Sequence, residues 1–221
     1  MTILLGFAVD DFVMLGADTR ATQSGPGGLI PIDDNTQKIF RTGVGLMAGA
    51  GWFDLVRSVV ARMETPPESN YQAAAILREE RDKTGLPLTD PRIQKTSWLL
   101  SYSTGDPSEV QTGLAYCYSQ NDYYPQSITA PDYFLVVPFG MSEEPEAQLR
   151  SILARAVKTK VDIPESKDLR GRYCGIIQDT VRCAATLCDS VSSTFQIGFH
   201  KGSLVRISPF LNDISGGFDW S

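Results

Sequence analysis

The chain has 221 residues, and its 20 Lys and Arg against 26 Asp and Glu give a net charge of −6. This length fits one domain, so we expect residues 1–221 to form a single unit. An apolar fraction of 42% excludes a disordered protein. The acidic balance argues against nucleic acid or an anionic membrane as the main partner.

A small number of histidines and cysteines limits the possible chemistry. His200 is the single histidine, so a zinc site built on several His is excluded, and a Ser-His-Asp triad could use only this residue. We expect His200 to face solvent beside a Lys201-Gly202 turn. The four cysteines, which form no C-x-x-C pair, are Cys117, Cys174, Cys183 and Cys188. We therefore expect no disulfide scaffold, no metal and no cofactor.

The start of the chain does not resemble a targeting segment. Residues 1–9 are apolar, but they lack a basic region and lead directly into Asp10-Asp11. The run is too short to span a membrane and has the wrong flanks for a signal peptide. We therefore expect a cytoplasmic protein with no membrane partner.

Strands are predicted where β-branched and aromatic residues cluster. Residues 2–9 and 12–17 form two such runs, and Asp10-Asp11 between them predicts a hairpin. The Gly- and Pro-rich residues 24–28 predict a loop. Further strands are predicted at residues 38–40, 44–48, 97–103, 114–119, 133–137, 194–200 and 204–208.

Helical periodicity predicts four helices, which occur as two pairs. They cover residues 52–63, 70–83, 142–160 and 176–191. Helices in pairs do not make alternating β-α-β units, so a doubly wound parallel sheet is disfavoured. The order predicts an α+β fold in which two antiparallel sheets pack face to face, each covered outside by a helix pair. This is a four-layer αββα sandwich.

Three features of the first fifty residues are ordinary alone and informative together. Thr2 becomes the N-terminal residue once Met1 is removed, which is expected because Thr is small. Asp18-Thr19-Arg20-Ala21-Thr22 follows the second predicted strand. Lys38 begins the next strand, and Met47-Ala48-Gly49 ends the one before the first helix.

These residues resemble the proteasome β-subunit family of N-terminal-nucleophile (Ntn) hydrolases, including its bacterial relatives. The likeness is specific over about the first sixty residues and follows the element order to about residue 208. It implies one proteasome-like Ntn domain with the αββα fold. It also implies a threonine peptidase subunit that hydrolyses peptide bonds within a self-compartmentalised complex.

The resemblance assigns roles to individual residues. Thr2 would be the nucleophile, with its own free α-amine, whose pKa is near ~8, as the base. Lys38 would activate the Thr2 hydroxyl, and Asp18 would pair with Lys38. The Gly49 N–H would bind the oxyanion, where one donor is worth roughly 3 kcal/mol.

Two further residues match the family near the other end of the chain. Asp189 and Ser192 form an Asp-x-x-Ser pattern that the family places near the amine of the nucleophile. The alternative is that both residues only end a helix. Ser193-Thr194 stand where the family usually has two glycines, and Ser142 either replaces a family serine or only caps its helix.

The family positions also suggest residues that contact substrate. Ala21, Phe40 and Met47 would line the pocket for the residue before the cleaved bond, which favours an apolar side chain there. Plain core positions for Phe40 and Met47 are an equal alternative. Thr22 would bind the peptide main chain as an added strand.

The resemblance implies partners as well. It implies a homo-oligomer that forms a ring or ring-like stack, with Trp52, Phe53 and Tyr71 as candidate contacts. The substrate would be an unfolded polypeptide or a peptide, and an ATP-dependent unfoldase is a possible partner.

Three alternative functions remain open at this point. Residues 43–48 match the G-x-G-x-x-A pattern of dinucleotide-binding enzymes, but the pattern lies in a predicted strand rather than at the start of a helix. A non-catalytic scaffold subunit would share the ring and the fold. An Ntn amidase acting on a small amide would share the nucleophile.

Overall fold

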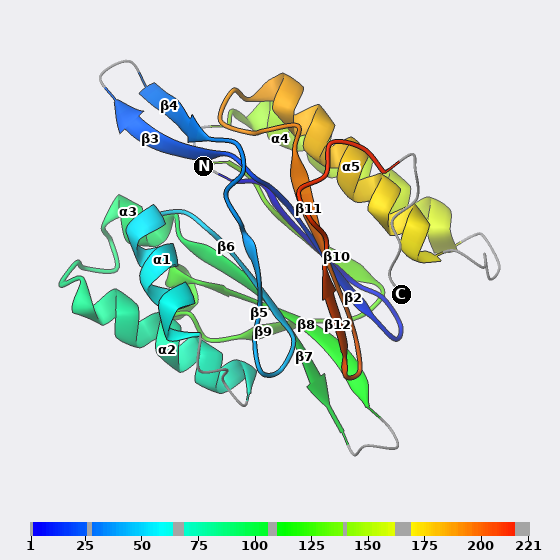
Figure 1. Ribbon diagram of the computed structural model, residues 1–221, viewed down its shortest axis with the longest axis horizontal. Coiled ribbons are helices and arrows are strands. Elements are labelled where there is room, and N and C mark those ends of the chain that lie inside the picture. Colours follow the sequence, from blue (N-terminus) through cyan, green and yellow to red (C-terminus); the bar gives the residue numbers. More distant parts are fainter. Residues whose placement is uncertain are drawn as a thin grey trace.

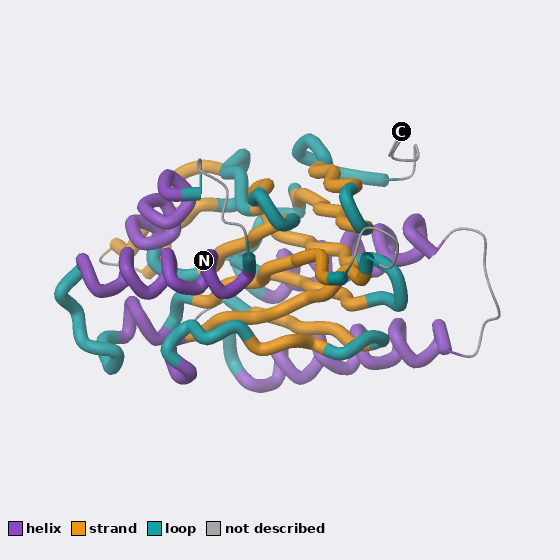
Figure 2. Tube along the Cα trace, turned by 90° about the horizontal axis from the view of Figure 1, so that it is seen from below, coloured by secondary structure: helices purple, strands orange, loops and turns teal. Residues whose placement is uncertain are grey.

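The computed structural model describes residues 2–25, 28–63, 69–105, 110–138, 141–161 and 169–214. Two five-stranded antiparallel sheets lie in the middle of the molecule (Figure 1). Helices lie outside them, with α4 and α5 on one side and α1 and α2 on the opposite side. Figure 2 shows the same arrangement from another direction, with strands at the centre. The predicted α+β class with two antiparallel sheets is confirmed.

The first sheet carries the predicted N-terminal hairpin. Its strands follow the order β10-β1-β2-β11-β12, and every neighbouring pair is antiparallel. Their bounds are Asp132–Val136 (β10), Leu4–Ala8 (β1), Val13–Asp18 (β2), Phe195–Lys201 (β11) and Leu204–Ile207 (β12). Because β1 and β2 are central, the hairpin is held on both sides.

The second sheet is built from the middle of the chain. It has the order β5-β6-β7-β8-β9, again antiparallel throughout. The bounds are Ile39–Arg41 (β5), Leu46–Ala50 (β6), Ser97–Thr104 (β7), Gln111–Tyr118 (β8) and Gln126–Ile128 (β9). Strand β6 contains the second half of the G-x-G-x-x-A match, residues 46–48, so these residues do not form the helix start that dinucleotide binding requires.

A two-stranded hairpin corrects the predicted loop at residues 24–28. Strands β3 (Ala21–Gly25) and β4 (Gly28–Asp33) pair antiparallel, while residues 26–27 lie outside the described residues. The hairpin extends away from both sheets (Figure 1). Ile30 and Ile32 on β4 are 53% and 57% exposed, so neither contributes to a core.

The helices confirm the predicted pairs, with different bounds for one helix and two short helices that were not predicted. Their bounds are Phe53–Arg62 (α1), Asn70–Lys83 (α2), Pro91–Gln94 (α3), Glu143–Val161 (α4) and Leu169–Leu187 (α5), and a short 3-10 helix covers Ser119–Asn121. Helix α2 has the predicted bounds, and the Ser69 hydroxyl caps it by accepting from Gln72 N at 3.1 Å. The predicted helix over 176–191 is wrong at both ends, because α5 begins at Leu169 and ends at Leu187.

Both faces of β1 are buried, which explains its continuous apolar sequence. Side chains alternate across a strand, so Leu5 and Phe7 pack towards α4 and α5, while Leu4 and Ala8 pack towards the second sheet. A cluster between the second sheet and α1 and α2 includes Met47. Three apolar clusters therefore hold the sheets and helices together.

His200 was expected to face solvent, and this prediction is wrong. The side chain is 1% exposed, and it lies at the opposite end of β2 from Asp18, since His200 pairs with Val13. Its Nδ1 is 2.8 Å from Ser101 Oγ and its Nε2 is 2.9 Å from Gly202 O. Strand β11 carries this side chain inward against β7, where hydrogen bonds replace the lost water.

Candidate active site

Thr2 and Lys38 meet in the interior at one end of the first sheet. Thr2 lies two residues before β1 and is 5% exposed, and Lys38 directly precedes β5 and is 8% exposed. The Lys38 Nζ donates a hydrogen bond to Thr2 Oγ1. It also donates to the backbone oxygen of Arg20 at 2.9 Å. The lysine amine therefore lies directly against the threonine hydroxyl.

Asp18 organises the backbone around this pair. The carboxylate is fully buried at the end of β2, where its Oδ1 accepts from Ile3 N at 2.9 Å. Its Oδ2 accepts from Arg20 N at 3.0 Å and from Ser192 N at 3.3 Å. Among the ion pairs of the described residues, none joins Asp18 to Lys38. Asp18 therefore acts on Lys38 through its charge, and on Thr2 through the backbone of Ile3.

Burial shifts the pKa values of both charged groups in this site. Burial lowers the pKa of the Lys38 amine, and the nearby Asp18 charge opposes this. Burial raises the pKa of Asp18, opposed by the charge of Lys38 and by the three N–H donors. A lysine with a lowered pKa gives up its proton more readily than an exposed one, so it suits proton transfer at a hydroxyl.

Gly49 lies in β6 and pairs with Trp98 on β7. A Cβ at Gly49 would lie 2.4 Å from Trp98 Cζ3, so the Trp98 ring leaves no room for a side chain. The backbone of β6 is thereby held close to the indole ring. Packing against Trp98 therefore requires a glycine at position 49, in addition to the predicted role of its N–H in binding an oxyanion.

Asp189 and Ser192 lie beyond α5, in the connection to β11, rather than at the end of the helix as expected. Asp189 is exposed, and its backbone oxygen accepts from Arg20 Nη1 at 2.6 Å. Ser192 is buried, and its Oγ accepts from Thr194 N at 3.1 Å. Ser192 thus contacts the Asp18 carboxylate through its own N–H, while the Asp189 backbone contacts Arg20.

The four predicted substrate-binding residues differ in exposure. Ala21 is buried at the start of β3, and Thr22 follows it at half-buried exposure. Met47 is fully buried in the cluster beneath α1 and α2, and Phe40 is partly buried against the same cluster. Ser142 is exposed just before α4, where its backbone oxygen accepts from Glu146 N.

Two polar residues belong to this site that the sequence prediction did not assign to it. Gln196 is buried in β11, and its Oε1 accepts from Lys38 N at 3.0 Å. A buried polar residue within the apolar run 195–199 is the signal that could have revealed it. Arg20 was recognised only as part of the Asp-Thr-Arg motif, although its backbone oxygen contacts the Lys38 amine.

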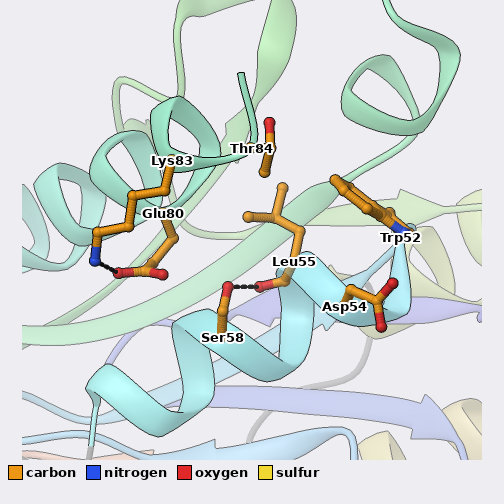
Figure 3. A pocket seen from close by; sticks show the side chains of 7 residues that line it. All are labelled: Trp52, Asp54, Leu55, Ser58, Glu80, Lys83 and Thr84. Carbon is orange, nitrogen blue, oxygen red and sulfur yellow. Dashed lines mark hydrogen bonds and ion pairs between the residues drawn. The ribbon is translucent and has the colours of Figure 1, made fainter. Parts of the chain in front are cut away.

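A hollow of about 230 Å³ lies elsewhere on the molecule, between α1 and α2 (Figure 3). Lys83 and Glu80 form an ion pair on one side of it, and Trp52 lies on the other. It is lined by Trp52, Asp54, Leu55, Ser58, Glu80, Lys83 and Thr84. None of these is a predicted catalytic or substrate-binding residue. The hollow is therefore separate from the Thr2 site.

Two other kinds of site are absent from the part of the chain that the structure covers. No group of three or more His, Cys, Asp or Glu residues there is arranged to hold a metal ion. The helices described are also too short or too polar for any of them to cross a membrane.

The two antiparallel sheets with their outer helices define the fold of proteasome β-subunit-like Ntn hydrolases, as the resemblance implied. The particular proteins that share it include Anbu from Hyphomicrobium sp. strain MC1. One structure of that protein, a Gly-1 mutant, has a TM-score of 0.61 and 16% identity, over 96% of this chain and 86% of that chain. A second has a TM-score of 0.58 and 16% identity, over 95% and 86%.

Anbu from Yersinia bercovieri, described as an ancestral β-subunit, is also similar. It has a TM-score of 0.60 and 15% identity, over 90% of this chain and 81% of that chain. Neither a sequence-family model nor a curated protein sequence matches the chain. The likeness at these identities establishes the fold.

Proposed function

We propose that this chain is a threonine-type peptidase subunit of a self-compartmentalised, proteasome-like complex. Thr2 is the nucleophile after removal of Met1, a residue that lies outside the described part of the chain. The observation that carries the proposal is the buried contact between Lys38 Nζ and Thr2 Oγ1. A threonine hydroxyl is a weak nucleophile, and a buried amine of lowered pKa beside it supplies the activation it needs.

The proposed reaction follows from these groups. Thr2 Oγ1 attacks the peptide carbonyl carbon, and its proton passes to the free α-amine, assisted by Lys38. The Gly49 N–H donates to the oxyanion of the tetrahedral intermediate. The C–N bond then breaks, and the leaving amine takes up the proton. Water hydrolyses the acyl ester that remains on Thr2.

The other residues act around this centre. The negative charge of Asp18 stabilises the protonated form of Lys38. Its carboxylate also orients the backbone of Ile3, which follows the nucleophile. Ser192 and Asp189 lie in the connection that contacts Asp18 and Arg20, which supports the proposal that they act near the α-amine. Thr22 binds the peptide main chain. Ala21, Phe40 and Met47 shape an apolar preference before the cleaved bond.

The assembly proposed for the chain is a homo-oligomeric ring or stack of four-layer αββα subunits. Exposed apolar side chains support it, because Phe53 and Tyr71 are 48% and 57% exposed on the α1 and α2 side. An unfolded polypeptide or peptide is the proposed substrate, with an ATP-dependent unfoldase as a candidate partner. The proposed compartment is the cytoplasm.

Hydrolysis of peptides tests the proposal. Wild-type protein should cleave a panel of fluorogenic and unfolded peptides, while Thr2→Ala and Lys38→Ala should lose at least about 100-fold in rate. Thr2→Ser keeps the hydroxyl and should retain activity. Lys201→Ala is the matched control, because Lys201 pairs with Asp11 at the surface. This variant should cleave the peptides at the wild-type rate.

Two outcomes would contradict this function in different ways. A protein that hydrolyses small amides but no peptide is an amidase with the same nucleophile. A protein that assembles but cleaves neither kind of substrate is a scaffold subunit.

A further inference from the structure

The Arg20 side chain joins two segments that lie far apart in the sequence. Its Nε donates to Asp34 Oδ1 at 2.5 Å and its Nη2 donates to Asp34 Oδ2 at 2.9 Å, a two-point ion pair. Its third contact is the Asp189 backbone oxygen. Asp34 directly follows the β3–β4 hairpin, and Asp189 follows α5. One guanidinium therefore fixes the base of the hairpin against the connection to β11.

The backbone of Arg20 belongs to the Thr2 site. Its N–H donates to Asp18 Oδ2 at 3.0 Å, and its oxygen accepts from Lys38 Nζ at 2.9 Å. The Lys38 amine is thus held between the Arg20 oxygen and the Thr2 hydroxyl. A displacement of the Arg20 backbone would move one of the two acceptors that direct this amine.

Thr19 reinforces the same arrangement. Its N–H donates to Thr194 O at 3.1 Å, and its Oγ1 donates to Asp34 O at 2.5 Å. Its backbone oxygen accepts from Thr36 N at 2.9 Å. The Asp18-Thr19-Arg20 segment is therefore held on one side by residues 34–36 and on the other by the connection after α5.

We propose that Arg20 and Asp34 are a positioning pair, which fixes the Arg20 backbone oxygen and thereby directs Lys38 Nζ onto Thr2 Oγ1. The catalytic consequence rests on the proposed function, whereas the effect on Lys38 does not. The Asp34 side chain is 48% exposed, and an ion pair this exposed contributes little to folding stability. The role of the pair is therefore the geometry of the site rather than the stability of the fold.

The charge state of Asp34 suits this role. The Arg20 guanidinium lowers the pKa of the Asp34 carboxyl, so the pair remains ionised throughout the neutral range. Lysine at position 20 would keep the charge but lacks the fork needed to bind both Asp34 oxygens together with the Asp189 backbone.

Asp34→Asn tests the proposal, with Asp33→Asn as the matched control. Both variants remove one carboxylate from neighbouring positions, but the Asp33 carboxylate accepts from Asn35 N and Thr36 Oγ1 rather than from Arg20. The first measurement is the pKa of the Lys38 amine, followed by NMR of lysine-labelled protein and assigned with Lys38→Met. The second is the rate of covalent reaction with a threonine-directed β-lactone.

The direction in which the Lys38 pKa changes distinguishes a loss of positioning from a simple loss of charge. Loss of a nearby negative charge alone would lower the pKa of Lys38 further. Release of the amine towards water should raise it towards its ordinary value, in Asp34→Asn and not in Asp33→Asn. Displacement of the Lys38 amine should also slow the β-lactone reaction roughly 10- to 100-fold in Asp34→Asn. Asp34→Glu keeps the carboxylate and should remain within about threefold of wild type.

Each outcome decides the proposal. A Lys38 pKa and a β-lactone rate in Asp34→Asn equal to those of Asp33→Asn, in a protein with wild-type thermal unfolding, would overturn it. If wild-type protein fails to react with the β-lactone, the proposed function fails. The Lys38 pKa values of the two variants then decide the positioning proposal alone.

Discussion

At the scale of single residues, the hydrogen bonds of Asp18 explain why a carboxylate occupies this buried position. Three backbone N–H groups converge on its two oxygens, and no neutral side chain of the same size accepts from all three. The same negative charge supports the ionised form of Lys38. Asp18 therefore contributes to the fold and to the proposed chemistry.

Asp18→Asn should accordingly destabilise the protein. The amide NH₂ would face N–H donors in place of one oxygen, which leaves buried donors without an acceptor and costs about 1–3 kcal/mol. Urea unfolding measures this difference in free energy. Asp11→Asn is the control, because Asp11 pairs with Lys201 at the surface and its loss should cost under about 1 kcal/mol. Equal effects of the two substitutions would contradict the account.

His200 gives the protein a pH dependence with a defined sign. Burial lowers the pKa of His200 below 6.5, its value in an unfolded chain. The unfolded state therefore binds a proton more readily than the folded state below about pH 6.5. The contribution of His200 to stability is complete above that pH and decreases as the pH falls towards the folded-state pKa.

A comparison with His200→Gln isolates this contribution, because the chain has no other histidine. Between about pH 7 and 5, wild type should lose more unfolding free energy than the variant, since carboxylates titrate in both proteins. Chemical denaturation at several pH values provides the measurement. Parallel pH profiles would show that His200 does not bind its proton more weakly in the folded protein.

At the scale of elements, sequence periodicity predicted the long helices and the apolar strands because packing follows the same period. The bounds of α2 are those predicted, and the N-terminal hairpin is confirmed. The β3–β4 hairpin could not be predicted, because β3 is polar, glycines stand where the two strands meet, and the hairpin is packed in neither five-stranded sheet. The inward direction of His200 was missed because a polar residue near a strand end gives no period-based signal.

The packing of α5 on β2 predicts opposite effects for two glycine substitutions. A Cβ at Gly16 would lie 2.5 Å from Ile177 Cγ2, so Gly16→Ala should destabilise the protein by about 1–3 kcal/mol. A Cβ at Gly175, within α5, meets no atom within 4 Å. Gly175→Ala should stabilise the protein by about 0.5–1 kcal/mol through helix propensity.

Thermal unfolding of both variants tests the arrangement of this helix. The expected result is a lower Tm for Gly16→Ala and a higher Tm for Gly175→Ala. A neutral Gly16→Ala would mean that α5 does not lie against β2 as described.

At the scale of the whole molecule, the candidate site combines segments that only the fold brings together. Thr2 and Asp18 come from the N-terminal hairpin, Lys38 from the start of the second sheet, and Ser192 from the connection after α5. The resemblance to the proteasome β-subunit family predicted all four of these residues. It could not predict Gln196 or the Asp34 contact of Arg20, because each depends on how distant segments meet.

The fold also bears on which group acts as the catalytic base. The single histidine lies at the far end of the first sheet from Thr2, so the imidazole does not take part in this site. An α-amine at Thr2, supported by the buried Lys38, is therefore the base that we propose for this site. The central claim is that the chain carries its nucleophile at a processed N-terminus.

Intact mass spectrometry before and after treatment with a threonine-directed epoxyketone tests this claim most directly. The account predicts a protein lighter by one methionine residue that gains one probe, with the adduct mapped to Thr2 and absent from Thr2→Ala and Lys38→Ala. A protein that keeps Met1 and gains no probe, or an adduct on another residue, would contradict it.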